Sequence, residues 1–344
     1  MARAKRSHHG GRSIAKREQK FQRWILKGGP AKAAETARLH TVFTTTDRVP
    51  SEFLKIRQNQ ATVRKIILQK YPEDPKTLPI LEIDNKNFQM NSCDQLKELE
   101  ATPGLPVVPI IFKLFNEFIP RSVQRGIITR FDALMATKPR YLLRSRNPHS
   151  SKRALHVGSW ECSMRRPSIT AEAQHQKTTT ITRLDNLLQY MKRHIFQKIV
   201  RAWCRDCPQL VCRSIRAHHR LQRCLKKAYK KRPTLDFGPA FFSIAMKDGS
   251  SEHVHLDFSD DIHTMTWIIP IGDWEGGEFC IPQLGIGIPL KPGQVLAIRT
   301  WLLAHCNAPI TAGRRVVFTC FSEKTVLKHA DLHILEKDGY IVFN

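Results

Sequence analysis

The stretch EHVHLDF, residues 252–258, decides the fold of this chain. In an extended strand, residues i and i+2 point the same way, so His255 and Asp257 are expected to share one face. A second strand has to bring His305 to them, and QVLAIRTWLLAH, residues 294–305, follows a Pro-Gly turn and can supply it. Two neutral imidazoles and one ionised carboxylate form a facial triad, which holds Fe(II) and leaves coordination positions open. The sequence therefore predicts a metal centre on strands.

Two neighbouring histidines leave an alternative open. His253 has the same strand phase as His255, and His263 follows the motif closely. Only His255 has an aspartate two residues further on, so it is the predicted ligand. His253 and His263 are surface histidines or miscounted ligands. The ordered series His-x-Asp, GGEF, PGQVLAI, His305, Pro309 and GRRVVFT is far more specific than His-x-Asp alone.

Short apolar strands surround the motif. From Phe237 to Ser322 they are separated by Asp-Gly, Pro-Ile-Gly, Gly-Gly and Pro-Gly turns. We predict a catalytic core over residues 233–325, closed by a C-terminal segment over residues 326–344.

The charge of the chain is large and unevenly spread. The sequence has 56 Lys and Arg against 30 Asp and Glu, a formal net charge of +26. Residues 138–232 hold 24 basic against four acidic side chains, a net +20, and residues 233–344 hold eight against 13, a net −5. A phosphate backbone is the polyanion that fits such a basic segment best. An acidic membrane and a solvated surface without a partner are the alternatives, but the segment lacks a clear amphipathic membrane pattern.

Two segments precede the core and its basic neighbour. Residues 1–40 form a basic tail suited to nuclear import or to a nucleic-acid arm, with a disordered solubilising tail as the alternative. Residues 41–137 are expected to be a helical and mixed support region packed on the core. The apolar run at residues 106–120 should be buried there.

The basic segment, residues 138–232, is expected to begin with a loop-like stretch that ends at Ser168. A helix from Thr180 and a second helix after Pro208 follow. We predict that this loop and these helices contact nucleic acid.

Composition narrows the class of protein further. Hydrophobic residues make up 41% of the chain, no apolar run reaches transmembrane length, and the charged N-terminus has no apolar signal region. We expect a soluble intracellular protein, located in the nucleus and without a membrane partner. The sequence does not give the oligomeric state, and a monomer is the working expectation.

The nine cysteines do not suggest a disulfide framework, because their number is odd and their spacing scattered. Six potential zinc ligands lie close together in the basic segment: Cys204, Cys207, Cys212, His218, His219 and Cys224. A Cys-x-x-Cys without a matching second pair is a weak signal. Buried reduced cysteines are therefore the prediction, with zinc as the alternative.

The metal motif and the sequence after it resemble the 2-oxoglutarate- and Fe(II)-dependent dioxygenases. The resemblance covers about residues 237–325. Within this superfamily, the segment DWEGGEFCIPQLGIGIPLKPGQVLAIRTWLLAHCNAPITAGRRVVFTCFSEK resembles compact fungal members of the TET/JBP branch. It implies an α+β fold with a double-stranded β-helix, or jelly-roll, core and N-terminal and inserted helices. It matches His255, Asp257 and His305 to the iron ligands and implies no further catalytic residue. Prolyl hydroxylase domains share the same layout.

The resemblance also implies a basic residue for the distal carboxylate of 2-oxoglutarate, shortly after His305. Arg315 and Thr319 share one strand face, and Arg314 lies on the other. We favour Arg315, supported by Thr319, because the planar guanidinium pairs with a carboxylate through two bonds. Arg314 is the alternative anchor, or faces outward toward a DNA phosphate. A bulge before these residues would invert the assignment.

The implied reaction is oxidation of a methyl group on a DNA base. The favoured substrate is 5-methylcytosine in duplex DNA, oxidised to hydroxymethylcytosine and further to formyl- and carboxylcytosine, with N6-methyladenine as a variant. The base would have to flip out of the duplex. A peptidyl-prolyl or other protein hydroxylase is the first alternative, and a DNA-binding protein without catalysis is the second.

The residues that read the substrate remain unknown. Several side chains near the motif are candidates for substrate contact, with core packing or surface solvation as the alternatives: Trp160, Trp267, Trp274, Trp301, Asp260 and Asp261.

Overall fold

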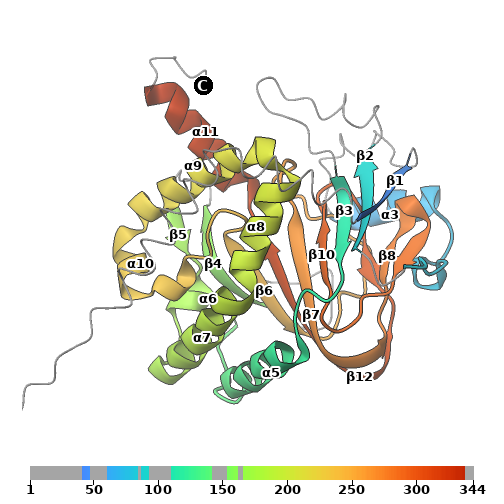
Figure 1. The fold of residues 1–344 in the computed structure, drawn as a ribbon, viewed down its shortest axis with the longest axis horizontal. Helices are drawn as coiled ribbons and strands as arrows, with labels where there is room; N and C mark the ends of the chain where they lie inside the picture. The colour runs from blue at the N-terminus through green and yellow to red at the C-terminus, as the bar shows by residue number, and fades with distance from the viewer. Residues whose placement is uncertain are drawn as a thin grey trace, which may run out of the picture.

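The computed structural model describes residues 41–46, 60–83, 87–92, 110–141, 153–161 and 166–337. The predicted basic tail, residues 1–40, lies outside these ranges, as does the end of the C-terminal segment. Figure 1 shows three layers side by side: a group of helices, a large sheet and a small sheet. The metal motif lies on the small-sheet side, so the helices and the motif are on opposite faces of the large sheet.

The large sheet has nine strands. In spatial order they are β1 (Thr41–Thr46), β2 (Asn87–Ser92), β3 (Ile110–Phe115), β10 (Val295–Ile298), β7 (Thr266–Gly276), β12 (Ile310–Phe321), β6 (Ser243–Asp248), β4 (Leu155–Glu161) and β5 (Pro167–Ile169). β1 and β2 are parallel, and the other neighbours are antiparallel.

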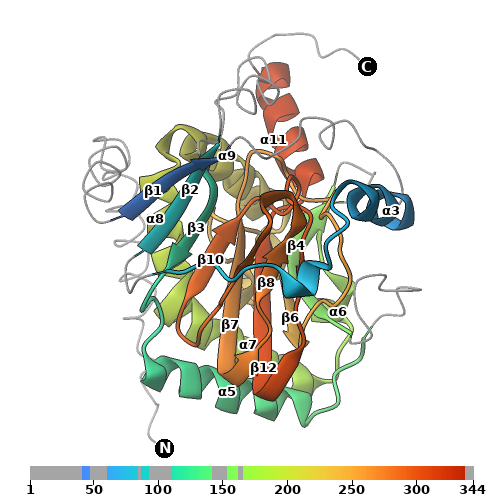
Figure 2. The same cartoon turned by 90° about the vertical axis from the view of Figure 1, so that its right-hand side faces the viewer.

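The small sheet consists of β11 (Cys306–Asn307), β8 (Phe279–Ile281) and β9 (Ile286–Ile288), in that order. An antiparallel bridge between His255 and His305 extends it at the β11 edge. From β6 to β12 the chain passes repeatedly between the two sheets, which is the arrangement of a jelly roll. The α+β class is confirmed, with a jelly-roll-like core. Figure 2, turned toward the small sheet, shows β8 in front of β7 and β12.

Helices cover the opposite face of the large sheet. They are α5 (Arg121–Met135), α6 (Ala171–Gln174), α7 (Thr178–Met191), α8 (Gln197–Asp206), α9 (Pro208–Cys224), α10 (Lys226–Lys231) and α11 (Lys324–Lys337). A single π-helical turn, Lys192–Phe196, joins α7 to α8. On the other side of the molecule, α3 (Gln60–Lys70) packs Ile67 against residues of the small sheet. None of the helices within the described ranges is long and apolar enough to cross a membrane.

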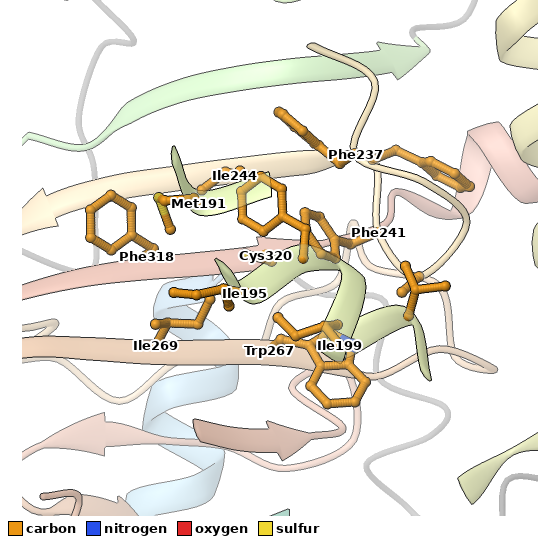
Figure 3. Packing of buried hydrophobic residues seen from close by; sticks show 14 of the residues in the cluster. Met191, Ile195, Ile199, Phe237, Phe241, Ile244, Trp267, Ile269, Phe318 and Cys320 are labelled. Carbon is orange, nitrogen blue, oxygen red and sulfur yellow. The ribbon is translucent and has the colours of Figure 1, made fainter. Parts of the chain in front are cut away.

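Two apolar clusters hold the layers together. Between the helices and the large sheet, Ile195 and Ile199 pack with Trp267 and Phe318 (Figure 3). Between the two sheets, a second cluster joins apolar residues of β2, β3, β8, β9 and β10. β3 and β10 in the large sheet therefore bury side chains on both faces, because alternate residues point to opposite sides.

Within the predicted apolar run, Ile110–Phe115 form β3 and are buried, whereas residues 106–109 lie outside the described ranges. The structure confirms two basic helices separated at Pro208. The loop-like reading of the stretch before Ser168 is wrong at β4, where Leu155–Glu161 pairs with β6. The inward positions of β4 include Ser159 and Glu161, so its apolar alternation is incomplete. The bonds of Glu161 to α9 and α11 replace the hydrophobic contacts that a periodicity search looks for.

Candidate metal centre

The two motif histidines are brought together by their own backbones. The N–H of His255 donates to the carbonyl of His305 at 3.1 Å, and the N–H of His305 donates to the carbonyl of His255 at 3.0 Å. Such a directly opposed antiparallel pair places both side chains on one face. The two imidazole centroids are 4.2 Å apart, and Phe279 of β8 stacks on His305 at 5.0 Å.

Asp257 completes the group. Its carboxylate oxygens lie 3.8 Å from Nε2 of His255 and 3.7 Å from Nε2 of His305. Among the described residues, these three are the group of His, Cys, Asp and Glu whose ligand atoms all lie within 4.8 Å of one another. The structure thus brings together the three residues predicted as ligands. Their role as iron ligands remains a prediction.

The hydrogen bonds of the two rings set which nitrogen faces the group. Nδ1 of His255 contacts the carbonyl of His253 at 2.8 Å, and Nδ1 of His305 contacts the carbonyl of Leu303 at 2.9 Å. A carbonyl only accepts, so each Nδ1 carries the proton and each Nε2 presents its lone pair toward Asp257. This is the tautomer that a metal ligand needs. The Asp257 side chain is 29% exposed, so the group can be reached from solvent.

A buried hydrogen-bond network fixes the turn that carries Asp257. The N–H of Asp257 donates to the carbonyl of Thr300, and the Asp260 carboxylate accepts from the hydroxyls of Thr300 and Thr266 at 2.9 and 2.7 Å. Burial, followed by the nearby charge of Asp257, raises the pKa of Asp260. The network ties the motif turn to the start of β7 and to the loop after β10.

The next residue connects the turn to the helices. Asp261 accepts two hydrogen bonds from Arg213 of α9, at 2.7 and 3.0 Å, and both side chains are buried. Surface solvation, one of the two alternatives for Asp260 and Asp261, is therefore wrong, since both side chains are buried and hydrogen-bonded inside the protein. Apolar spacing gives no sign of such pairs, because the partner of Asp261 lies 48 residues away in the chain.

Arg315 lies buried on the face of β12 that meets the small sheet. Its guanidinium donates to the carbonyl of Gly277 and, at 2.8 Å, to the hydroxyl of Ser250. Its Nε is buried and has no hydrogen-bond partner. Burial lowers the pKa of Arg315 to about 10, which leaves it charged at neutral pH. A buried cation with an unused donor is suited to an anionic ligand.

Gly277 explains why the guanidinium fits where it does. Its φ is +70°, and a Cβ built on it would lie 2.9 Å from the guanidinium of Arg315. The second glycine of GGEF is thus needed both for its backbone conformation and for its lack of a side chain. Gly277 contacts Arg315, and Phe279, two residues on, contacts His305. Both contacts come from the segment that leads into β8, so Arg315 and the metal group lie on the same side of the large sheet.

The other two residues predicted for the co-substrate differ in position. Thr319 is on the same face of β12 as Arg315 and pairs with Ile268. Arg314 is on the opposite face, is about half exposed, and bonds Asp132 of α5 and Asp248 of β6 at 2.8 Å. The register shift in β12 lies between Ile310 and Ala312, before the arginines, so the predicted phase is retained.

The other histidines and cysteines considered as metal ligands are not part of the group formed by His255, Asp257 and His305. His253 is exposed, and His263 is buried beside Asp261, where burial lowers its pKa to about 4. Cys204 and Cys207 are buried, and burial raises the pKa of Cys204 to about 12. Cys212 and Cys224 are exposed thiols on α9. Within the described ranges, these cysteines form no group of three ligand atoms that could hold zinc.

The candidate tryptophans occupy different layers. Trp267 is buried in the cluster between helices and sheet and stacks on Phe115, so it is core. Trp301 packs partly buried against the cluster between the sheets. Trp274 lies on the Arg315 side, with the guanidinium carbon 5.8 Å from its ring centroid. Trp160 is a half-buried residue of β4.

No family model and no curated protein matches the chain. Among solved structures, NgTET1 in complex with 5mC DNA is 14% identical, over 81% of this chain and 100% of that chain, with a TM-score of 0.47. A 2OG-Fe(II) oxygenase family oxidoreductase from Burkholderia pseudomallei is 15% identical, over 62% of this chain and 87% of that chain, with a TM-score of 0.29. Both likenesses are distant, and the function proposed below rests on the metal group and Arg315 instead.

Proposed function

We propose that this protein is a 2-oxoglutarate- and Fe(II)-dependent dioxygenase built on a double-stranded β-helix. One observation carries the proposal: His255, Asp257 and His305 converge on one point, and the buried cation Arg315 lies on the same side of the large sheet. The donor set suits Fe(II), because two imidazole nitrogens and a carboxylate leave open positions for a co-substrate. The buried guanidinium suits the distal carboxylate of a dicarboxylic acid.

Each residue has a defined part in this proposal. The two Nε2 atoms and the Asp257 carboxylate would hold the iron, and Arg315 would orient the co-substrate from the side of β8. When bound, iron and 2-oxoglutarate supply the oxidation of a C–H bond by O2, with succinate and CO2 as co-products. The apolar cluster between the sheets would limit the water around the co-substrate, and the hydrogen bonds of Asp260 would hold the ligand turn. Thr319 lies on the same strand face as Arg315 and is the proposed polar support for the co-substrate.

The proposed substrate is duplex DNA that carries a methylated base, with 5-methylcytosine favoured and N6-methyladenine as a variant. The net charge of +26 supports a polyanionic partner. A methyl group inside a stacked duplex cannot reach a metal that lies between two sheets, so the base would flip out. Action on DNA also accords with a location in the nucleus.

The test is oxidation of defined DNA. Purified protein is incubated with Fe(II), 2-oxoglutarate and duplexes that contain one methylated base, and the nucleosides are measured by mass spectrometry. We expect hydroxymethylcytosine, followed by formyl- and carboxylcytosine at longer times. Succinate formed without loss of a methyl base on any duplex would retain the dioxygenase and exclude the DNA substrate.

A protein hydroxylase is the second candidate, and one observation favours it. The exposed Lys and Arg of α7 to α10 belong to the helix layer, across the large sheet from the metal group. Within the described residues, the helices of the basic segment therefore do not surround the entrance to the metal group. Proline-containing peptides assayed beside methylated DNA distinguish the two functions.

A further inference from the structure

Two cysteines face each other across the small sheet. Cys280 of β8 and Cys306 of β11 are directly opposed in the antiparallel register, and a side-chain hydrogen bond joins their thiols. Both are free thiols, and both are buried. A single buried thiol on a strand ordinarily serves as a small hydrophobic side chain. This pair differs, because each thiol has the other as its neighbour.

The spacing of the two strands at this pair suits a disulfide. Two residues further along, the N–H of Ala308 donates to the carbonyl of Glu278 at 2.9 Å. Hydrogen-bonded pairs recur every two residues, so Cys280 and Cys306 form such a pair, with Cα atoms about 5.5 Å apart. Disulfides span about 4.4–6.8 Å between Cα atoms. The Cβ atoms of opposed residues need to approach by about 1 Å, and this adjustment falls on β11, a strand of two residues.

The pair lies on the outer face of the small sheet, behind the metal group. Phe279 and His305, the chain neighbours of the two cysteines, stack on each other at the inner face. Because successive residues of a strand point to opposite faces, the cysteines point outward. They pack there in an apolar cluster with Ile67 of α3 and Leu78. Figure 2 shows the segment after α3 crossing this outer face in front of β8.

We propose that Cys280 and Cys306 form a reversible disulfide when the protein meets hydrogen peroxide. The sulfur of one cysteine attacks the peroxide, the O–O bond breaks, and a sulfenic acid and one water are formed. The second sulfur displaces the sulfenic oxygen, which leaves as a second water, and the S–S bond forms. The two thiols thus lose two hydrogen atoms and two electrons, and the peroxide takes them up. A dithiol reductant reverses the reaction by thiol–disulfide exchange.

The disulfide would fasten the strands that position His305 without occupying the metal group. It closes the chain between residues 280 and 306 into a loop, which contains β9, β10 and His305. A crosslink of this kind stabilises a protein mainly by restricting the unfolded chain. We therefore expect the oxidised protein to melt about 5 °C above the reduced protein.

The experiment treats the reduced protein with hydrogen peroxide in the presence of a chelator, without iron, 2-oxoglutarate or DNA. The thiols are then mapped by mass spectrometry after non-reducing digestion with trypsin, which cuts after Arg299, between the two cysteines. Only a disulfide keeps the two resulting peptides joined. The test variants are Cys280→Ala and Cys306→Ala. Cys320→Ala, at a buried thiol of β12 outside the pair, is the matched control, and circular dichroism confirms that all three variants are folded.

We expect joined peptides in the unaltered protein and in Cys320→Ala, their separation by dithiothreitol, and no joined peptides in either test variant. The rise in melting temperature should follow the same pattern and should be reversed by the reductant.

Oxidation of the exposed Cys212 without joined peptides would overturn the proposal. So would sulfenic or sulfinic acid at Cys280 or Cys306 in place of the disulfide, or an equal rise in melting temperature in Cys280→Ala. Because neither iron nor 2-oxoglutarate is present, the result is independent of the dioxygenase assay.

Discussion

Two faces of one sheet place neighbouring arginines in opposite settings. On the face toward the small sheet, Arg315 is buried and its Nε has no hydrogen-bond partner. On the face toward the helices, Arg314 reaches the rim, is about half exposed and is held by Asp132 and Asp248. One residue of shift along a strand exchanges these settings, because the side-chain period is two. The comparison shows that the residue type alone does not determine whether an arginine on this sheet can bind an anionic ligand. Its burial and its hydrogen-bond partners determine this.

The largest effect is expected when a predicted metal ligand on the small-sheet side is removed. His255→Ala should lower Fe(II) affinity and the oxidation rate by at least about a thousandfold, since a catalytic metal contributes several kcal/mol. Isothermal titration with Fe(II) under anaerobic conditions and succinate release measure the two effects. His253→Ala, at an exposed histidine two residues earlier, should leave both unchanged. Equal losses in the two variants would show that the ligand assignment is wrong.

The next effect lies on the helix face and concerns stability. Arg213→Ala leaves Asp261 buried without its partner, which should lower the free energy of unfolding by about 3–5 kcal/mol. Arg223→Ala, at an exposed position of the same helix, should change it by no more than about 0.5 kcal/mol. Urea denaturation followed by circular dichroism compares them. Similar values for the two arginines would mean that the buried pair does not hold α9 to the motif turn.

A third prediction compares the two arginines directly. Arg315→Lys keeps the charge but loses the planar fork, so the Kd for 2-oxoglutarate should rise about 10- to 100-fold, as expected for a hydrogen bond to a charged group. Affinity for Fe(II) should not change, because the ligands are intact. Arg314→Lys should leave the co-substrate Kd as it is. A rise in Arg314→Lys and not in Arg315→Lys would assign the anchor to the other face.

The smallest expected effect tests the network behind Asp257. Thr300→Val removes the hydroxyl that donates to Asp260 while keeping the side-chain volume, and should weaken Fe(II) binding about tenfold. Thr311→Val, at an exposed threonine of β12, provides the matched control. If Thr300→Val lowered the melting temperature and left Fe(II) affinity unchanged, the network would support the fold and not the metal group.

The sequence predicted the parts of the site that follow a local rule. The phase of Arg315 depends on a two-residue period, and the strand is regular from Ala312 onward. His255 and Asp257 follow the same rule. Thr300, a partner of Asp260, and Arg213, the partner of Asp261, were missed because they lie 40 and 48 residues away in the chain, and no periodicity connects them.

The basic segment shows the same limit at a larger scale. The net charge of +20 is correct as a sum, but it does not distinguish basic side chains that pair inside the protein from those exposed at its surface. Arg213 and Arg220 face inward and pair with acids of the core and of β4, whereas Lys226 and Lys230 face outward. Only the packed structure separates the two groups, because both have the same composition.

α9 joins the helix layer to the turn that carries Asp257. Arg213 of α9 donates two hydrogen bonds to Asp261, four residues after Asp257, and both side chains are buried. The position of a predicted metal ligand thus depends in part on a helix that does not contact it, so loss of the Arg213–Asp261 pair should change the geometry of Asp257 as well as the stability of the fold.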